Sequence, residues 1–129
     1  MILGLGIDLC EIVRMARAIE KPRFLERVYA PSERGRVLAA APVRRAEIAA
    51  GLFAAKEAVA KALGTGIVGF GMADIEITPD AMGCPECALH GGALTRARAM
   101  AGEAGFRVLV SITHEGGMAA ATAILEVGG

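Results

Sequence analysis

Apolar and polar residues repeat along this chain at two periods, and each period predicts a different kind of element. Residues 43–64 form the clearest helical segment, because apolar side chains recur there at spacings of four, three, four and four. The members of this stripe are Ile48, Leu52, Ala55, Val59 and Leu63. Such spacing places them on one buried face of an α-helix. Gly64-Thr65-Gly66 follows directly, and glycine there is typical of a left-handed helix end.

The chain begins with the period of two that a β-strand requires. Over residues 2–9, one face carries the large apolar side chains Leu3, Leu5, Ile7 and Leu9. We expect that face to contact the core. The opposite face is nearly bare backbone at Gly4 and Gly6, and it ends at the carboxylate of Asp8. Glycine leaves room for another segment to lie against the strand.

The rest of the chain predicts an α+β fold. Residues 74–79 and 86–90 predict a hairpin, and residues 92–104 predict an alanine-rich helix. Two strands, Phe106–Glu115 and Met118–Val127, follow and meet at a glycine pair typical of a tight hairpin. This order predicts helices covering an antiparallel sheet. No linker or repeat divides the 129 residues, so we expect a single domain over residues 1–129.

Three charged side chains lie near the edge of the apolar stripe on the predicted helix. Glu57 falls beside the stripe, with Lys56 and Lys61 close to it. A carboxylate here and another at Asp8 are suitable ligands for a divalent cation, and the ammonium groups suit phosphate. Each feature also has a structural explanation. A Glu57–Lys61 pair one turn apart stabilises a helix by roughly 0.2–0.5 kcal/mol, and Asp8 could cap a helix that begins near Glu11.

The composition indicates a protein that associates with copies of itself. The apolar fraction is 54%, yet no apolar run reaches the roughly 18 residues of a membrane-spanning helix. The N-terminus does not have the pattern of a signal peptide. With only three cysteines, we expect a cytoplasmic protein without a membrane association. The excess of apolar residues then indicates an interface between subunits.

The net charge is zero, but the charges are distributed unevenly. Residues 11–45 contain nine Lys or Arg and four Glu, a balance of +5, and the remainder has a balance of −5. A basic stripe can be simply a solvated face, or it can bind an acidic partner. Its members are Arg14, Arg17, Lys21 and Arg27, with Phe24 among them. The chain has five aromatic residues and no nucleic-acid recognition motif, which disfavours a nucleic-acid partner.

Four motifs, in order along the chain, resemble holo-acyl-carrier-protein synthases, the small bacterial 4′-phosphopantetheinyl transferases. The motifs are Gly6-Ile-Asp8-Leu-Cys-Glu11-Ile-Val-Arg14, then Phe24-Leu-Glu-Arg27-Val-Tyr29 with Glu33, then Ala55-Lys56-Glu57-Ala58 through Gly64-Thr-Gly66, and Ser111-Ile-Thr-His114-Glu. They span nearly the whole chain. Gly83-Cys84-Pro85 departs from the family, which often has lysine in the middle.

The resemblance implies transfer of 4′-phosphopantetheine from coenzyme A to a serine of apo-acyl carrier protein, in fatty acid biosynthesis, with release of adenosine 3′,5′-bisphosphate. It also implies a trimer with active sites between neighbouring subunits. Asp8 and Glu57 would hold Mg²⁺ and, with Lys61, form the catalytic group. Glu57, through a metal-bound water, is the candidate general base.

The resemblance further implies two binding surfaces. Contacts to coenzyme A would come from Lys56, Gly64, Thr65, Ser111, Thr113 and His114, although Lys56 could instead pair with a neighbouring acid. The acidic acyl carrier protein would dock on the basic stripe, at Arg14, Arg17, Lys21, Phe24 and Arg27. Two alternatives remain open: a metal-dependent hydrolase of a nucleotide diphosphate, and a non-enzymatic oligomeric binding module whose carboxylates are only structural.

Overall fold

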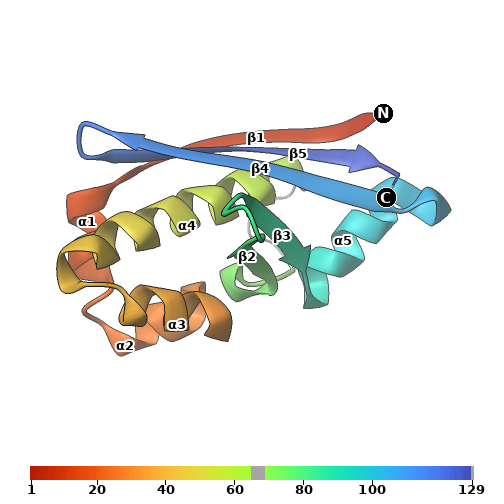
Figure 1. Cartoon of the computed structure of the whole chain (residues 1–129). Coiled ribbons are helices and arrows are strands. Elements are labelled where there is room, and N and C mark those ends of the chain that lie inside the picture. The colour runs from red at the N-terminus through yellow and green to blue at the C-terminus, as the bar shows by residue number, and fades with distance from the viewer. Residues whose placement is uncertain (65–68, 129) are drawn as a thin grey trace.

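The computed structural model describes residues 1–64 and 69–128. Its main sheet contains β1 (Ile2–Glu11), β5 (Met118–Val127) and β4 (Phe106–Glu115), in the order β1-β5-β4. Both strand pairs are antiparallel. The sheet forms one layer, and the helices lie beneath it in Figure 1. The predicted α+β fold is therefore confirmed.

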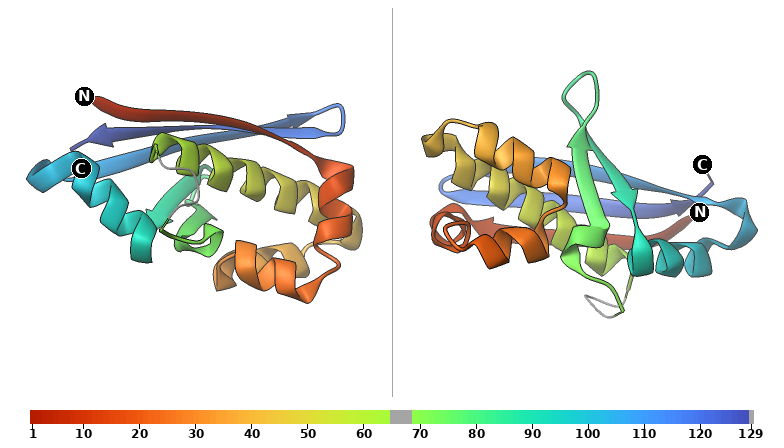
Figure 2. Two further views of the ribbon diagram at one scale, coloured as in Figure 1. Left: turned by 180° about the vertical axis from the view of Figure 1, so that it is seen from behind. Right: turned by 90° about the horizontal axis from the view of Figure 1, so that it is seen from below.

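Four helices follow β1 and make up the second layer. They are α1 (Ile12–Ala18), α2 (Pro22–Val28), α3 (Pro31–Ala39) and α4 (Pro42–Ala62). The long helix α4 runs along the sheet, and α2 and α3 lie on its far side (Figures 1 and 2). In the described part of the chain, no helix is both long and apolar enough to cross a membrane.

The C-terminal half adds a hairpin and one more helix at the other end of the molecule. A short 3-10 helix, η1 (Met72–Asp74), leads into β2 (Ile75–Pro79) and β3 (Pro85–Leu89), which pair as a separate two-stranded sheet. Then come α5 (Gly91–Ala101) and the 3-10 helix η2 (Gly102–Ala104). The helix predicted over 92–104 thus ends three residues early, because its last turn is tighter than an α-helix.

Helix α4 is the centre of the fold because both of its sides are covered. The predicted stripe residues Leu52, Ala55, Val59 and Leu63 are buried, as expected. Small residues on the other faces are buried as well, so nearly every position from Ala49 to Ala62 is enclosed. Alanine permits this close packing and favours the helix. Gly64 then has φ +78°, which confirms the predicted left-handed helix end.

Strand β1 has the opposite orientation to the one expected from its pattern. Its glycine face packs against α4, whereas Leu5, Ile7 and Leu9 are 69%, 63% and 65% exposed. The expectation that the leucine face contacts the core is therefore wrong. The reason is steric, because the backbone of α4 can come this close only to a strand face without side chains.

Gly4 and Gly6 are required at this contact by space. A Cβ atom on Gly6 would lie 1.8 Å from the carbonyl oxygen of Ala58, and one on Gly4 would lie 1.8 Å from that of Ala62. Two strand residues advance by about 6.6 Å and four helix residues by about 6 Å. Successive glycines therefore meet successive turns of α4. Asp8 is the next residue on this face, so the contact carries its carboxylate to the helix.

The outer face of the sheet is largely apolar, with three hydroxyl side chains, and is uncovered in a single chain. Cross-strand neighbours form three rows on it: Leu5–Ile124–Leu109, Ile7–Thr122–Ser111 and Leu9–Ala120–Thr113. Leu109 is 44% exposed, in addition to the three exposed β1 residues. A contiguous exposed apolar face of this kind marks an interaction surface more often than it marks ordinary protein surface.

Replacing Gly6 by alanine tests the contact between β1 and α4. We expect Gly6→Ala to lower the free energy of unfolding by about 3 kcal/mol or more, because neither backbone can move aside. Chemical denaturation measures this. Gly35→Ala is the matched control: its Cβ would meet nothing within 4 Å, and alanine should stabilise α3 by about 0.5–1 kcal/mol. Equal changes in the free energy of unfolding for the two variants would contradict the close approach of β1 to α4.

Candidate active site

Asp8 and Lys61 meet where β1 crosses α4. The Lys61 Nζ donates to the carbonyl oxygen of Ile7 at 2.9 Å and lies 3.2 Å from the Asp8 Oδ1. Side chains on a helix lean toward its N-terminus, so Lys61 reaches back along α4 toward this carboxylate. Its side chain is 52% exposed and that of Asp8 is 19% exposed. The pair therefore faces solvent and is open to a ligand.

Glu57 lies one turn before Lys61 and completes the cluster. Burial raises the pKa of the Glu57 carboxyl, the negative charge of Asp8 raises it further, and Lys61 lowers it. Two carboxylates thus share one small region with one ammonium group. The Glu57–Lys61 ion pair considered from the sequence is replaced by the bond between Lys61 and β1. The structure brings together all three residues predicted as the catalytic group.

Lys56 has a different environment from its neighbour Glu57. Its ammonium group is fully buried, bonds the Glu33 carboxylate at 2.5 Å and also donates to the carbonyl oxygen of Ile75. The sequence left two partners open for Lys56, coenzyme A or a neighbouring acid, and the structure pairs it with the acid Glu33. The enclosed ammonium group cannot reach a bound nucleotide, so the expected contact between Lys56 and coenzyme A is corrected to a structural ion pair.

Glu33 is the acceptor for three elements at once. Its carboxylate accepts from the backbone N–H of Ala30 at 2.7 Å and from that of Ile77 at 2.8 Å, in addition to Lys56. Burial lowers the pKa of Lys56, and the nearby Glu33 charge opposes that change. Removing one partner of such a buried pair costs about 3–5 kcal/mol, because the other charge is left alone. The pair fixes α4 against α3 and β2, and so fixes the position of Glu57.

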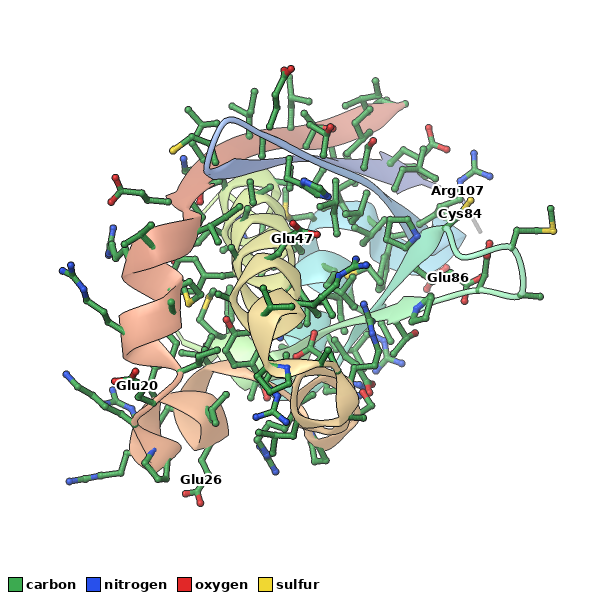
Figure 3. All side chains as sticks on the ribbon, turned by 60° about the vertical axis from the view of Figure 1, so that its left-hand side comes forward. Glu20, Glu26, Glu47, Cys84, Glu86 and Arg107 are labelled. Atoms are coloured by element: carbon green, nitrogen blue, oxygen red, sulfur yellow. The ribbon has the colours of Figure 1, made fainter. Side chains whose placement is uncertain are left out.

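The expected coenzyme A contacts do not converge with this cluster within one chain. Ser111 and Thr113 lie on the outer face of the sheet, two strands away from β1, and Asp8 lies on the inner face. His114 is on the inner face, where its Nε2 lies 3.4 Å from the Oε1 of Glu47. Figure 3 shows Glu47 on the first half of α4. Gly64 ends α4 beside the cluster, and Thr65 is outside the described residues.

The basic stripe occupies the outside of α1 and α2. Arg14, Arg17, Lys21 and Arg27 are exposed. Phe24 is half-buried, because its ring stacks on Phe53 with centroids 6.3 Å apart. Glu20 and Glu26 project from the same region, as Figure 3 shows, so acids interrupt the stripe. Beside it lies a groove of about 1050 Å³ whose lining includes Lys21, Arg23, Phe24, Arg27, Phe70 and Met72.

The family of the chain follows from comparison with known proteins. The family model described as the 4′-phosphopantetheinyl transferase superfamily matches residues 4–109. That span contains Asp8, Glu57 and Lys61. The chain belongs to this superfamily.

Relatives within the superfamily are holo-[acyl-carrier-protein] synthases. That of Solidesulfovibrio magneticus is 46% identical over 129 residues, covering 98% of this chain and 99% of its own. That of Clostridium perfringens is 41% identical over 128 residues, covering 98% and 95%. These relatives confirm the family resemblance and the class of enzyme, a phosphopantetheinyl transferase.

Solved transferase structures have the same fold. The synthase of Neisseria meningitidis is 34% identical with a TM-score of 0.83, and the match covers 98% of this chain and 99% of that one. The synthase of Bacillus anthracis, solved in complex with CoA (3′,5′-ADP), is 33% identical with a TM-score of 0.82 and 99% coverage of both chains. Among the described residues of this chain, no group of three or more His, Cys, Asp or Glu could hold a metal ion.

Opposite shifts in the pKa of Glu57 test the proximity of the three charged groups. We expect Asp8→Asn to lower this pKa, because a neighbouring negative charge is removed, and Lys61→Met to raise it. Carboxyl ¹³C NMR titration measures both. Glu103→Gln, an exposed change in η2, is the control and should leave the titration of Glu57 unaltered. Shifts of the same sign in the first two variants would contradict the cluster.

Proposed function

We propose that this transferase moves the 4′-phosphopantetheine arm of coenzyme A onto a serine of an apo-acyl carrier protein, in support of fatty acid biosynthesis. The second product is adenosine 3′,5′-bisphosphate. The observation that carries the proposal is the cluster of Asp8, Glu57 and Lys61 at the β1–α4 contact. The related synthase of Solidesulfovibrio magneticus is named for an acyl carrier protein, and that of Bacillus anthracis was solved in complex with CoA (3′,5′-ADP), which supports these two substrates.

In the reaction, the serine Oγ forms a bond to the pantetheine-side phosphorus of the diphosphate. The bond from this phosphorus to the bridging oxygen breaks, and adenosine 3′,5′-bisphosphate leaves with that oxygen. Glu57 accepts the proton of the serine hydroxyl. Burial and the negative charge of Asp8 raise the pKa of this carboxyl, and a cation held by the same two carboxylates would lower it again. Lys61 stabilises the negative charge that develops on the leaving oxygen.

Asp8 and Glu57 are the residues that would hold Mg²⁺. The negative charge of Asp8 raises the pKa of Glu57, so a cation between them would relieve a repulsion that the fold imposes. Mg²⁺ commonly takes one or two protein carboxylates and fills its other positions with water and phosphate oxygens. Two carboxylates are therefore a sufficient donor set. When bound, the ion would neutralise the diphosphate and fix its geometry.

The active enzyme is a homotrimer in which a neighbouring copy completes the site. Two observations support this: the outer sheet face exposes Leu5, Ile7 and Leu9, and Ser111 and Thr113 lie on that same face, away from Asp8. Contact between copies through this face would bring Ser111 and Thr113 toward a neighbour's carboxylates. Coenzyme A would then contact Gly64 and Thr65 of one copy and the segment Ser111–His114 of another.

The acidic carrier protein docks on the basic stripe of α1 and α2. Exposed arginines there would attract it and orient it before contact, an effect mainly on the rate and geometry of encounter. Phe24 supplies an apolar point among these charges. The lining of the groove beside α2 combines the cations of Lys21, Arg23 and Arg27 with the aromatic rings of Phe24 and Phe70, which suits the same kind of surface.

Intact-mass spectrometry of an apo-acyl carrier protein tests the function. With this protein, coenzyme A and Mg²⁺ present, we expect the carrier to gain one phosphopantetheine group. A chelator should abolish the gain, and Glu57→Gln should slow it by about 10²–10⁴-fold. Glu103→Gln should transfer at the wild-type rate.

The other two interpretations give different results in the same assay. Cleavage of coenzyme A without modification of the carrier would indicate the hydrolase and contradict transfer. Binding of coenzyme A with neither reaction, and unchanged binding in Asp8→Ala and Glu57→Ala, would indicate a binding module.

A further inference from the structure

Arg96, on α5, lies against the end of α4 and is not among the predicted site residues. Its Nε donates to the carbonyl oxygen of Leu63 at 2.9 Å. Its Nη2 lies 3.5 Å from the point where a Cβ atom on Gly64 would be. The guanidinium group therefore covers the last turn of α4 (Figures 1 and 2 show α5 at this end of the molecule).

The contact with Leu63 uses only one of the N–H donors of the guanidinium group. Arginine carries five N–H donors, and within residues 1–64 and 69–128 the carbonyl oxygen of Leu63 is the acceptor that Arg96 meets. No carboxylate of those residues pairs with it, whereas Arg44 and Arg107 pair with Glu47 and Glu126. A half-buried cation with spare donors and no acid beside it is suited to an anion.

The surroundings identify the kind of anion. Gly64 follows Lys61 by one helical turn, and the N–H of Gly64 bonds the Lys61 carbonyl oxygen at 2.9 Å. Lys61 extends from this turn toward Asp8, and Arg96 lies against its end. The last turn of α4 therefore has two cations, contributed by two different helices. A nucleotide with several phosphates could contact both, whereas a singly charged ligand would need only one.

We propose that Arg96 is a substrate-binding residue that contacts a phosphate group of coenzyme A beside Gly64. This inference rests on the proposed function and adds a residue to its nucleotide site. The bond from Nε to Leu63 holds the planar group in place, which reduces the entropy lost on binding. The two Nη atoms, which donate to no acceptor within residues 1–64 and 69–128, can then meet phosphate oxygens in the forked geometry that arginine favours.

Capping of α4 is the structural explanation that the test must separate from binding. A cation near the last carbonyl groups stabilises a helix whether or not a substrate is present. Capping alone would make Arg96 variants less stable without changing their affinity for coenzyme A. The measurements are therefore KM and kcat for coenzyme A and for 3′-dephospho-coenzyme A at fixed carrier protein, together with thermal unfolding.

Arg96→Gln should raise KM for coenzyme A about tenfold, the loss expected for one hydrogen bond to a charged group. Arg96→Lys keeps the charge but not the fork and should give an intermediate KM. Arg98→Gln is the matched control, since Arg98 is exposed on the same helix, and it should leave KM unchanged. A contact to the 3′-phosphate predicts a KM for dephospho-coenzyme A that Arg96→Gln does not change. A contact to the diphosphate predicts a rise for both substrates.

Folded Arg96 variants that are less stable but have a wild-type KM for coenzyme A would overturn the proposal and leave capping as the role of Arg96. If Arg96→Gln does not fold, the same comparison is made with Arg96→Lys. The two levels of inference fail separately. Transfer by the wild-type chain with an unchanged KM in the variants removes only the role of Arg96. Absence of transfer by the wild-type chain removes the proposed function, and this inference with it.

Discussion

The close approach of β1 to α4 is the contact on which the candidate site depends. Gly4 and Gly6 let the strand lie directly on the carbonyl groups of Ala62 and Ala58. The same strand face continues to Asp8, and the neighbouring positions on α4 are Glu57 and Lys61. The charged cluster is therefore a consequence of backbone packing. On the other side of α4, the buried Lys56–Glu33 pair fixes the helix against α3 and β2, so the helix that carries Glu57 is held from both sides.

One copy of the chain contains only a part of the site that we propose. The carboxylates face the helical layer, and Ser111 and Thr113 are on the opposite face of the sheet. That outer face also carries the exposed leucine and isoleucine side chains of β1. Association through this face would bury apolar surface and bring the two sets of residues together. Stability of the assembly and completion of the site would then have the same physical cause, the packing of β1 with its glycines inward.

Much of the fold could be predicted from the sequence because periodicity is a local property. The strands Phe106–Glu115 and Met118–Val127, the hairpin at Gly116-Gly117 and the end of α4 at Gly64 are where the pattern predicts them. The orientation of β1 could not be predicted, because it depends on which face the α4 backbone can approach. That Lys56 could pair with an acid was open from the sequence, but Glu33 could not be identified as that acid, because the two residues are 23 positions apart in the chain. Arg96 is in no recognised motif.

A double-mutant cycle on Asp8 and Glu57, measured as kcat/KM for phosphopantetheine transfer, would show whether the β1–α4 contact makes one functional unit. The four proteins are the wild type, Asp8→Asn, Glu57→Gln and the double variant. When two residues act as one unit, the losses of kcat/KM from their single substitutions are strongly non-additive. We expect kcat/KM of the double variant to lie within about threefold of that of the slower single variant. A double variant whose loss equals the product of the two single losses would contradict a shared role and separate the two carboxylates.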